Sequence, residues 1–360
     1  MKKNKVLILF ILLLLFNCSS KELRQTVNNE TQNDFINAVD ISLFPKIELN
    51  NPIFKDSFGV QMPFLEILKS KGINTIRLRL WVNPIDEHSS FDEVKSFSDT
   101  LKSMGFSIYL TLHYSDTWAD PGQQIIPQDW QNISYAILKN RVYDYTKMVV
   151  QQIDPDLIQI GNEINNGFLH PEGHRYSQPH QFIELISEGI SAVRDYSNHA
   201  QVMLHYAGHQ GAEEFFDEVK DVDYDIIGLS YYPIWHGKSL IALEQNLIEL
   251  RALYTKDIMI AETAYPFTLD WNDWTNNIVG LEDQLILPEY PATPEGQKQF
   301  VQQLKSMLSS LDGGIGLAYW GADLIAWDGS ESTAGSPWEN QALFDFNNQA
   351  LPALDVFENP

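Results

Sequence analysis

Two glutamates each follow a short apolar segment of the chain. Glu163 comes just after Leu157–Ile160, and Glu262 comes just after Ile258–Ala261. Two carboxyl groups on either side of an anomeric carbon can cleave a glycosidic bond, one as acid and the other as nucleophile or as the base that activates water. The pair therefore predicts this chemistry. As an alternative, both are rim residues in ion pairs with Arg77 and Arg79.

The spacing of the two carboxyl groups would decide the stereochemistry, and the sequence leaves it open. A separation of about 5–5.5 Å predicts retention at the anomeric carbon, and a larger one predicts inversion. An arginine beside the nucleophile would hold it ionised. Arg77 and Arg79 point to the same side of a strand because side chains alternate. We expect Arg79 to be this arginine and Arg77 to form a buried pair one layer down; the opposite assignment stays open.

Short apolar strands alternate with longer amphipathic helices from Phe35 to the end. The expected strands are Ile36–Ile41, Asn74–Trp81, Ser107–Leu112, Leu157–Ile160, Gln201–His205, Ile226–Ser230, Ile258–Ala261 and Ile315–Trp320. The expected helices are Met62–Lys71, Phe91–Met104, Tyr135–Gln152, Phe182–Tyr196, Leu240–Tyr254 and Thr293–Leu311. Eight such repeats without a linker predict an α/β fold with one domain, a closed (β/α)₈ TIM barrel.

Polar and aromatic residues follow all eight predicted strands. In a (β/α)₈ barrel, active sites form at the carboxyl ends of the strands. We therefore expect these side chains to converge on one site, with Glu163 and Glu262 facing each other from the fourth and seventh strands. The candidates for substrate binding are Asp40, Arg79, Trp81, His113, Asp116, Trp118, Asn162, Tyr231, Tyr232, Trp235, His236 and Trp320.

The N-terminus has the layout of an export signal. Three lysines precede an apolar run that ends at Phe16, and Cys18 is the only cysteine in the chain. The run is too short for a membrane-spanning helix. We expect residues 1–17 to be a signal peptide, Cys18 to be lipidated, residues 18–34 to form a flexible tether, and residues 35–360 to form the catalytic domain. Simple secretion or a periplasmic location, with a spare thiol, is the alternative to an anchor at the bacterial cell surface or outer membrane.

The net charge argues against nucleic acid as a partner. It is −24 for the whole chain and becomes −27 once residues 1–17 and their three lysines are removed. An acidic surface with nine tryptophans is compatible with a neutral sugar ligand. We expect a monomer that meets a membrane only through its N-terminal lipid.

The sequence offers little evidence for a bound metal or cofactor. His170 and His174 are four residues apart, but Pro171 and Gly173 between them indicate a loop rather than a helical metal site. Asp270, Asn272 and Asp273 could bind a structural calcium ion through their oxygen atoms, but the sequence favours a solvated acidic loop without an ion. The sequence contains no nucleophile elbow or Walker loop, and no dinucleotide fingerprint follows the first strand. We expect no required cofactor and no catalytic metal.

Several longer stretches resemble one known family, the arabinogalactan endo-β-1,4-galactanases of glycoside hydrolase family 53. The resemblance runs from about residue 36 to the end, and its most specific part is HYSDTWADP at residues 113–121 combined with QIGNE at 159–163. The other matching stretches are Asp40–Ser42, Ile76–Pro84, Ser230–Gly237, Ala261–Thr263 and Ala318–Trp320.

This resemblance implies a retaining enzyme that cleaves β-1,4-galactan side chains of pectin internally. It assigns Glu163 as the general acid/base and Glu262 as the nucleophile. It also implies that Asn162 binds the sugar 2-hydroxyl, that His113 and Tyr231 or Tyr232 surround the nucleophile, and that Trp320 forms the floor of the site.

Two departures from the family pattern affect the sugar groove. Gly321-Ala322-Asp323 replaces the Glu-Pro that usually follows the final Tyr-Trp, and Pro266–Pro294 does not align with the family. Related barrel enzymes that cleave mannan or xylan are therefore alternatives. A surface glycan-binding protein that has lost catalysis is another, although it would have little reason to keep both glutamates.

Overall fold

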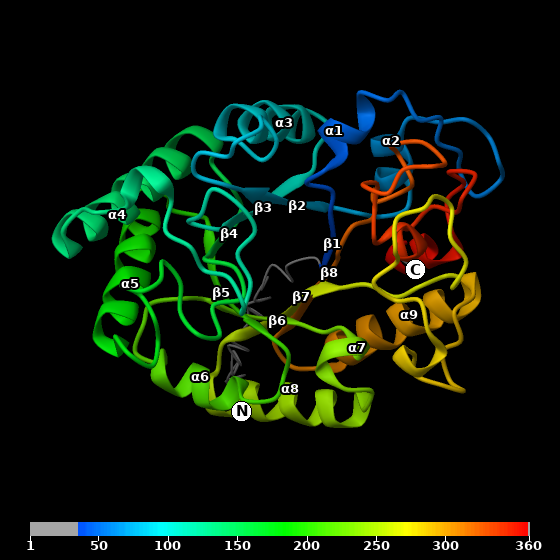
Figure 1. Ribbon diagram of the computed structural model, residues 1–360. Coiled ribbons are helices and arrows are strands. Elements are labelled where there is room, and N and C mark those ends of the chain that lie inside the picture. The colour runs from blue at the N-terminus through cyan, green and yellow to red at the C-terminus, as the bar shows by residue number, and fades with distance from the viewer. Residues whose placement is uncertain (1–34, 359–360) are drawn as a thin grey trace, which may run out of the picture. The chain divides into compact units, whose positions relative to one another are not determined.

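The structure is a computed structural model and describes residues 35–358. The predicted signal peptide, the tether and Cys18 lie outside the described residues. From Phe35 onward the chain forms one compact unit. Its centre is a closed barrel of eight parallel strands in sequence order, with β1 paired to β8 (Figure 1). The prediction of a (β/α)₈ barrel is therefore confirmed.

The strands agree closely with those expected from the sequence. They are β1 (Ile36–Asp40), β2 (Thr75–Leu80), β3 (Ser107–Leu112), β4 (Leu157–Ile160), β5 (Gln201–Ala207), β6 (Ile226–Ser230), β7 (Asp257–Thr263) and β8 (Gly314–Tyr319). β5 and β7 extend beyond their predicted ends. Both extensions lie toward the carboxyl edge of the barrel, where the site residues are found.

Helices surround the barrel, and four of the nine α-helices in residues 35–358 begin at a capping side chain. The α-helices are α1 (Phe44–Glu48), α2 (Phe64–Ser70), α3 (Phe91–Ser103), α4 (Tyr135–Ile153), α5 (Pro179–Tyr196), α6 (Ala212–Glu218), α7 (Pro233–His236), α8 (Leu240–Tyr254) and α9 (Pro294–Ser310). Side-chain oxygens of Ser90, Ser134, Ser239 and Thr293 accept backbone N–H groups at the starts of α3, α4, α8 and α9. The short helices α1, α6 and α7 were not expected, because a helix of so few residues is too short to show a helical repeat of apolar residues.

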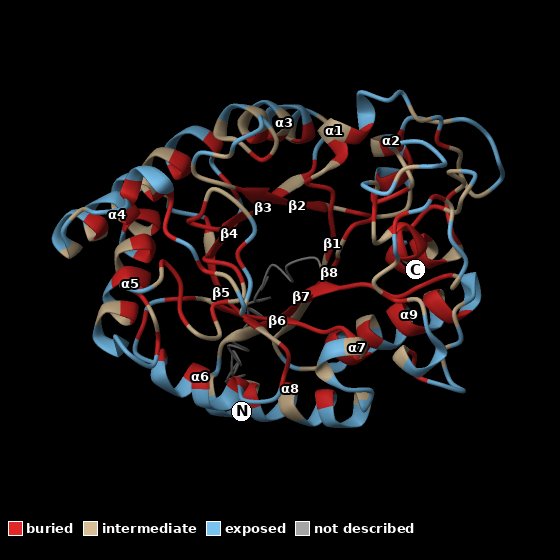
Figure 2. Cartoon of the chain, viewed as in Figure 1, coloured by how far each residue is buried: buried red, intermediate tan, exposed pale blue. Residues whose placement is uncertain are grey.

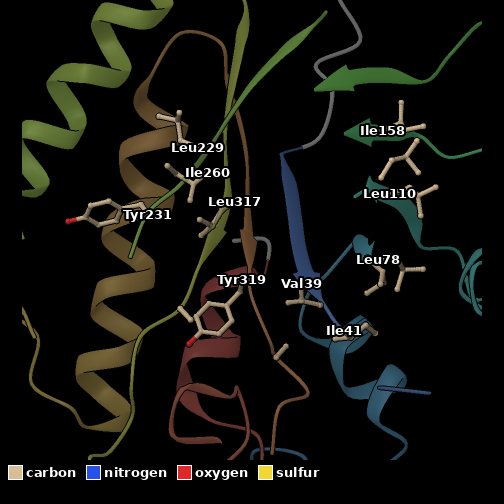
Figure 3. Close-up of a cluster of buried hydrophobic side chains, with 14 of the residues drawn as sticks. Val39, Ile41, Leu78, Leu110, Ile158, Leu229, Tyr231, Ile260, Leu317 and Tyr319 are labelled. Atoms are coloured by element: carbon tan, nitrogen blue, oxygen red, sulfur yellow. The ribbon is translucent and has the colours of Figure 1, made fainter. Parts of the chain in front are cut away.

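Two separate cores hold the barrel together. Outward-facing strand residues such as Val39, Leu78, Ile158 and Leu317 pack in the larger core between strands and helices (Figure 3). The smaller core fills the barrel itself and contains Ala38, Tyr109, Leu157, Met203, Ile226, Met259, Ala261 and Ala318. Figure 2 shows the strands mostly buried and the outer helix faces exposed. This alternation fixes which strand residues point into the barrel and toward the site above.

The register of β7 is irregular where the strand carries Glu262. Leu229 of β6 lies opposite Ile260, but the next residue, Ser230, lies opposite Glu262, so one residue of β7 is left over. A bulge of this kind re-aims the following side chain. Ala261 points into the barrel core, and the bulge lets its neighbour Glu262 face inward as well.

None of the helices in residues 35–358 is long and apolar enough to cross a membrane.

Candidate active site

A cavity of about 600 Å³ opens at the carboxyl ends of the barrel strands. Glu163 and Glu262 both line it. So do most of the predicted binding residues: Asp40, Arg79, His113, Trp118, Asn162, Tyr232, Trp235, His236 and Trp320. The convergence expected from the strand ends is therefore what the fold produces.

Glu262 is held by donors on both of its oxygens. Arg77 Nη2 donates to Oε1 at 2.5 Å, and the Tyr232 hydroxyl donates to Oε2 at 3.0 Å. The other terminal nitrogen of Arg77 pairs with Asp40 Oδ2 at 2.7 Å. Burial raises the pKa of Glu262, and the Arg77 guanidinium opposes that rise. A carboxylate fixed in this way is oriented to attack as a nucleophile.

The two arginines of β2 have the reverse of the expected assignment. Arg77, not Arg79, contacts Glu262. The Arg79 guanidinium lies over the rings of Trp118 and Trp81, at 3.9 and 4.4 Å, and its Nε donates to Ser89. Arg79 is nearer the mouth of the barrel, as expected, but Glu262 reaches down to the layer of Arg77. Arg79 instead supports the aromatic wall of the cavity.

Glu163 stands on a strained turn after β4. Its φ of 47° lies in the left-handed region, two residues after Gly161 at φ 77°. A Cβ on Gly161 would approach Ile164 to 2.5 Å, so glycine is required there. Glu163 Oε1 lies 2.5 Å from Ser230 Oγ, and no arginine pairs with it among the residues that the structure describes. Burial, followed by the negative charge of Glu262, raises the pKa of Glu163 to about 8.

The two carboxyl groups are close enough for a retaining mechanism. One oxygen of Glu163 and one of Glu262 lie within 4.8 Å of each other. Inverting enzymes need about 6.5–9.5 Å between the two carboxyl groups to admit a water molecule, and retaining enzymes about 5–5.5 Å. The spacing favours direct attack by one carboxylate on the sugar.

Asn162 and His113 present fixed hydrogen-bonding groups beside the carboxylates. Asn162 Nδ2 donates to the carbonyl of Ala119 at 2.8 Å, and its Oδ1 accepts from Arg77 at 3.1 Å. His113 Nδ1 accepts from Trp81 Nε1 and from the Ala119 amide. Burial, with help from Arg79, lowers the pKa of His113 well below its usual value. The ring is therefore neutral, and its Nε2 carries the hydrogen that can be donated to a ligand.

A row of tryptophans forms one wall of the cavity. Trp118, Trp320 and Trp338 follow one another with ring centroids 5.9 and 5.4 Å apart, and Trp235 meets Trp338 at 5.9 Å. Such rings can stack on the apolar faces of neutral sugars. Trp338 was not predicted, since it comes from the long segment after β8 and no strand end marks it.

Three predicted binding residues lie outside the cavity wall. Trp81 is behind Trp118, with ring centroids 5.6 Å apart. Asp116 accepts the backbone amides of Asn83 and Gln128 and so fixes a loop. Tyr231 is fully buried in the outer core, where its hydroxyl donates to the Gly237 carbonyl (Figure 3). Of the two adjacent tyrosines, Tyr232 is the one that reaches Glu262.

Some residues of the site had only weak signals or none in the sequence. Asp323 is buried in the cavity lining with its pKa raised well above the usual value, by burial and then by Asp40. It stands where the chain departs from the family pattern. His205 and Ser230 lie below the cavity, one on β5 and the other at the end of β6. His205 was the last residue of a predicted strand, but nothing in the sequence linked it to Glu163.

Among residues 35–358, one cluster has the spacing of a metal site, namely Glu163, His205 and Glu262. The residues around it oppose a cation. Arg77 already supplies a positive charge at 2.5 Å from Glu262. Both ring nitrogens of His205 lie within hydrogen-bonding distance of Ser230 and Asn162. The cluster fits acid and nucleophile chemistry better than metal binding.

Comparison with known proteins agrees with the geometry. Residues 36–357 match the profile of Glycosyl hydrolase family 53. An arabinogalactan endo-β-1,4-galactanase from Cellvibrio japonicus is 36% identical over 90% of this chain and 90% of its own. The Ignisphaera aggregans GH53 catalytic domain superposes with a TM-score of 0.85 at 39% identity, over 90% of this chain and 96% of that domain. A fungal β-1,4-galactanase structure superposes with a TM-score of 0.78 at 27% identity, over 91% of this chain and 100% of that chain.

Proposed function

The chain belongs to glycosyl hydrolase family 53, and on that premise we propose that it hydrolyses internal bonds of β-1,4-galactan with retention of configuration. The observation that carries the proposal is the pair Glu163 and Glu262, whose oxygens lie within 4.8 Å at the carboxyl ends of β4 and β7. The names of relatives such as the Cellvibrio japonicus galactanase support the substrate. The reaction needs no cofactor.

In the first step Glu262 attacks C1 of the sugar while protonated Glu163 donates its proton to the leaving oxygen. The C1–O bond to the departing chain breaks as the C1–O bond to Glu262 forms. Arg77 and Tyr232 hold the attacking carboxylate through hydrogen bonds of 2.5 and 3.0 Å. The raised pKa of Glu163, about 8, keeps its proton available near neutral pH.

In the second step water attacks C1 of the covalent intermediate. Glu163, now ionised, takes the proton from that water, and Glu262 leaves as a carboxylate. The pKa of Glu163 falls once Glu262 is neutralised as an ester, because the nearby negative charge is gone. The same residue therefore acts as an acid in one step and as a base in the next.

Stacked aromatic rings in the cavity wall suit a segment of a neutral polymer. The tryptophan row of Trp118, Trp320, Trp338 and Trp235 provides apolar surface without charge selection. We assign sugar contacts to Asp40, Arg79, His113, Asn162, Tyr232, Trp235, His236 and Trp320, and structural support to Trp81, Asp116 and Tyr231. Because one chain supplies all these groups, we propose that it acts as a monomer.

A panel of polysaccharides assayed for new reducing ends tests the proposal. We expect oligosaccharides from β-1,4-galactan, a rapid fall in polymer length, and no product with the Glu163→Gln variant. Activity confined to mannan or xylan would contradict the proposed substrate but not the proposed retaining mechanism. Binding of galactan without any product would show a glycan-binding protein instead.

We also propose a structural calcium site between the loop after β7 and the segment after β8. Asp273 and Glu339 are buried, and Asp273 Oδ2 and Glu339 Oε2 have no hydrogen-bond partner among residues 35–358. Unpaired carboxylate oxygens suit Ca²⁺. Of the predicted ligands, Asp270 and Asn272 are neighbours of Asp273. A Tm that falls with a chelator and recovers with Ca²⁺ would support the site; an unchanged Tm would leave a solvated acidic loop.

For the N-terminus we propose export through a signal peptide at residues 1–17, lipidation of Cys18 and a tether over residues 18–34 ahead of the catalytic domain. The support is the sequence pattern alone. The anchored protein would sit at the cell surface or outer membrane. Membrane fractionation tests this, since Cys18→Ala should release the protein into the soluble fraction. Retention of the variant in the membrane would exclude the anchor.

A further inference from the structure

A chain of hydrogen bonds runs from Glu163 away from the cavity. Glu163 Oε1 lies 2.5 Å from Ser230 Oγ, Ser230 Oγ lies 2.9 Å from His205 Nε2, and His205 Nδ1 lies 3.2 Å from Asn162 Oδ1. Ser230 and His205 are fully buried. Neither is needed to bind sugar, so their contact with Glu163 calls for another explanation.

The direction of this chain is fixed at Asn162. Its Oδ1 accepts from Arg77 Nη2 at 3.1 Å, and its Nδ2 donates to the Ala119 carbonyl at 2.8 Å. A guanidinium can only donate and a carbonyl can only accept, so the amide has one orientation. His205 Nδ1 faces an acceptor and must therefore carry a hydrogen.

His205 is neutral, so only one of its two ring nitrogens carries a hydrogen. Burial, and then the charge of Arg77, lowers the pKa of His205 well below its usual value. With the hydrogen on Nδ1, Nε2 has only a lone pair and needs a donor. The Ser230 hydroxyl is at 2.9 Å and has a single hydrogen to give. Once that hydrogen goes to His205, Ser230 can only accept from Glu163.

We propose that His205 and Ser230 are positioning residues that hold Glu163 in its acid form in the free enzyme by presenting it with an acceptor rather than a donor. The inference rests on the proposed role of Glu163 as acid/base. When Glu163 has given its proton to the leaving oxygen, its carboxylate faces a Ser230 lone pair. Ser230 can turn toward it only by leaving His205 Nε2 without a donor. Uptake of a proton from the attacking water restores the original arrangement.

Other charged groups also face Glu163 and must be kept constant in a test. Glu262 on β7 and Asp120 in the loop after β3 favour its acid form, while Arg77 on β2 opposes it, as would a hydrogen bond donated by Ser230 to the ionised carboxylate. Tyr232, after β6, also lies near Glu163. Substitutions at Ser230 change none of these groups, so they isolate the direction of one hydrogen bond.

The pH dependence of kcat/KM on galacto-oligosaccharide separates the two directions. Loss of activity on the basic side follows deprotonation of Glu163. The basic limb is the part of the pH profile where kcat/KM falls as pH rises. If Ser230 accepts, Ser230→Ala removes the acceptor and should move this limb to lower pH by about one unit. At a pH above the limb, this shift corresponds to a tenfold loss of kcat/KM. Ser230→Thr keeps the hydroxyl and should restore the limb. A limb that moves to higher pH, or does not move, would overturn the proposal.

Further variants and a second substrate provide controls for this experiment. His205→Phe removes the acceptor at Nε2, frees Ser230 to donate to the carboxylate, and should move the basic limb down as well. If Ser230→Ala does not fold, Ser230→Cys, with its weak acceptor, should show the same downward shift. On an aryl galactoside whose leaving group needs no proton, all these variants should keep wild-type rates of aryl release above the limb. Absence of wild-type product from galactan would instead refute the proposed function.

Discussion

The ends of β4 and β7 carry the same side chain in opposite surroundings. Glu262 receives Arg77 and Tyr232, two donors, one of them charged. Glu163 contacts a serine whose hydrogen we assign to His205, and it has the negative charge of Glu262 nearby. The donors around Glu262 stabilise its carboxylate against the burial that raises its pKa, whereas the surroundings of Glu163 favour the carboxylic acid. The contrast shows that the neighbours of a glutamate, not its residue type, divide the roles of nucleophile and acid.

The largest effect expected from this contrast is the loss of the nucleophile. Glu262→Ala should lower kcat on galactan by a factor on the order of 10⁵, or about 7 kcal/mol, because no covalent intermediate can form. Azide should rescue turnover of an activated aryl galactoside and yield the α-linked galactosyl azide, identified by NMR. Glu289→Ala, at an exposed glutamate outside the cavity lining, is the matched control. A β-linked adduct would exchange the two assignments.

Removing the acid should be less severe and should depend on the leaving group. Glu163→Gln should lower kcat/KM on galactan by a factor on the order of 10²–10⁴, which is the usual contribution of a positioned proton donor. Glycosylation by a dinitrophenyl galactoside should be nearly unaffected, since that leaving group needs no proton. In the wild type, kcat/KM on galactan should fall as pH rises through about 8, where Glu163 loses its proton. Equal losses on both substrates would contradict its role as acid.

The two arginines offer a smaller and more selective comparison. Arg77→Lys should lower kcat/KM by a factor on the order of 10², because lysine cannot join Glu262 and Asp40 at once. It should also move the acid limb of the pH profile upward, since the pKa of Glu262 rises when the guanidinium is lost. Arg79→Lys disturbs the stack on Trp118 and a sugar contact but no contact of Glu262, and it should leave that limb in place. An acid limb displaced by Arg79→Lys alone would restore the original assignment.

The smallest expected effect separates two adjacent tyrosines. Tyr232→Phe removes one hydrogen bond to Glu262 and should lower kcat about tenfold, or about 1.4 kcal/mol. Tyr231→Phe should leave kcat unchanged and lower the free energy of unfolding by about 1 kcal/mol, because its hydroxyl donates to the Gly237 carbonyl and makes no contact with Glu262 in residues 35–358. Steady-state kinetics and urea unfolding measure the two effects. The comparison fails if Tyr231→Phe reduces kcat as much as Tyr232→Phe does.

The sequence predicted the barrel well because its signal is repeated. Each of the eight strands reads as a short apolar run, and closure of the barrel follows from their number and from the alternating helices. Glu163 and Glu262 could be placed at strand ends because each follows one of these apolar runs. The short helices α6 and α7 were missed because about one or two turns carry no period.

The finer errors share one physical cause. Alternation along one strand says which side a residue faces, but not which layer of the barrel a side chain from another strand reaches. Glu262 reaches the layer of Arg77, and so the roles of Arg77 and Arg79 were exchanged. Alternation also stops where a strand ends or bulges. That is why it could not choose between Tyr231 and Tyr232. Trp338 lies in a loop, where only the folded chain shows that it stacks on Trp320.

The backbone of Glu163 also bears on how this protein can evolve. A φ of 47° on a glutamate costs roughly 1–3 kcal/mol of stability, since only glycine, asparagine and aspartate adopt it readily. Selection for heat resistance alone would therefore favour replacing this residue. Adaptation to higher temperature has to find its gains elsewhere in the barrel, because the residue most easily improved for folding is one that turnover cannot spare.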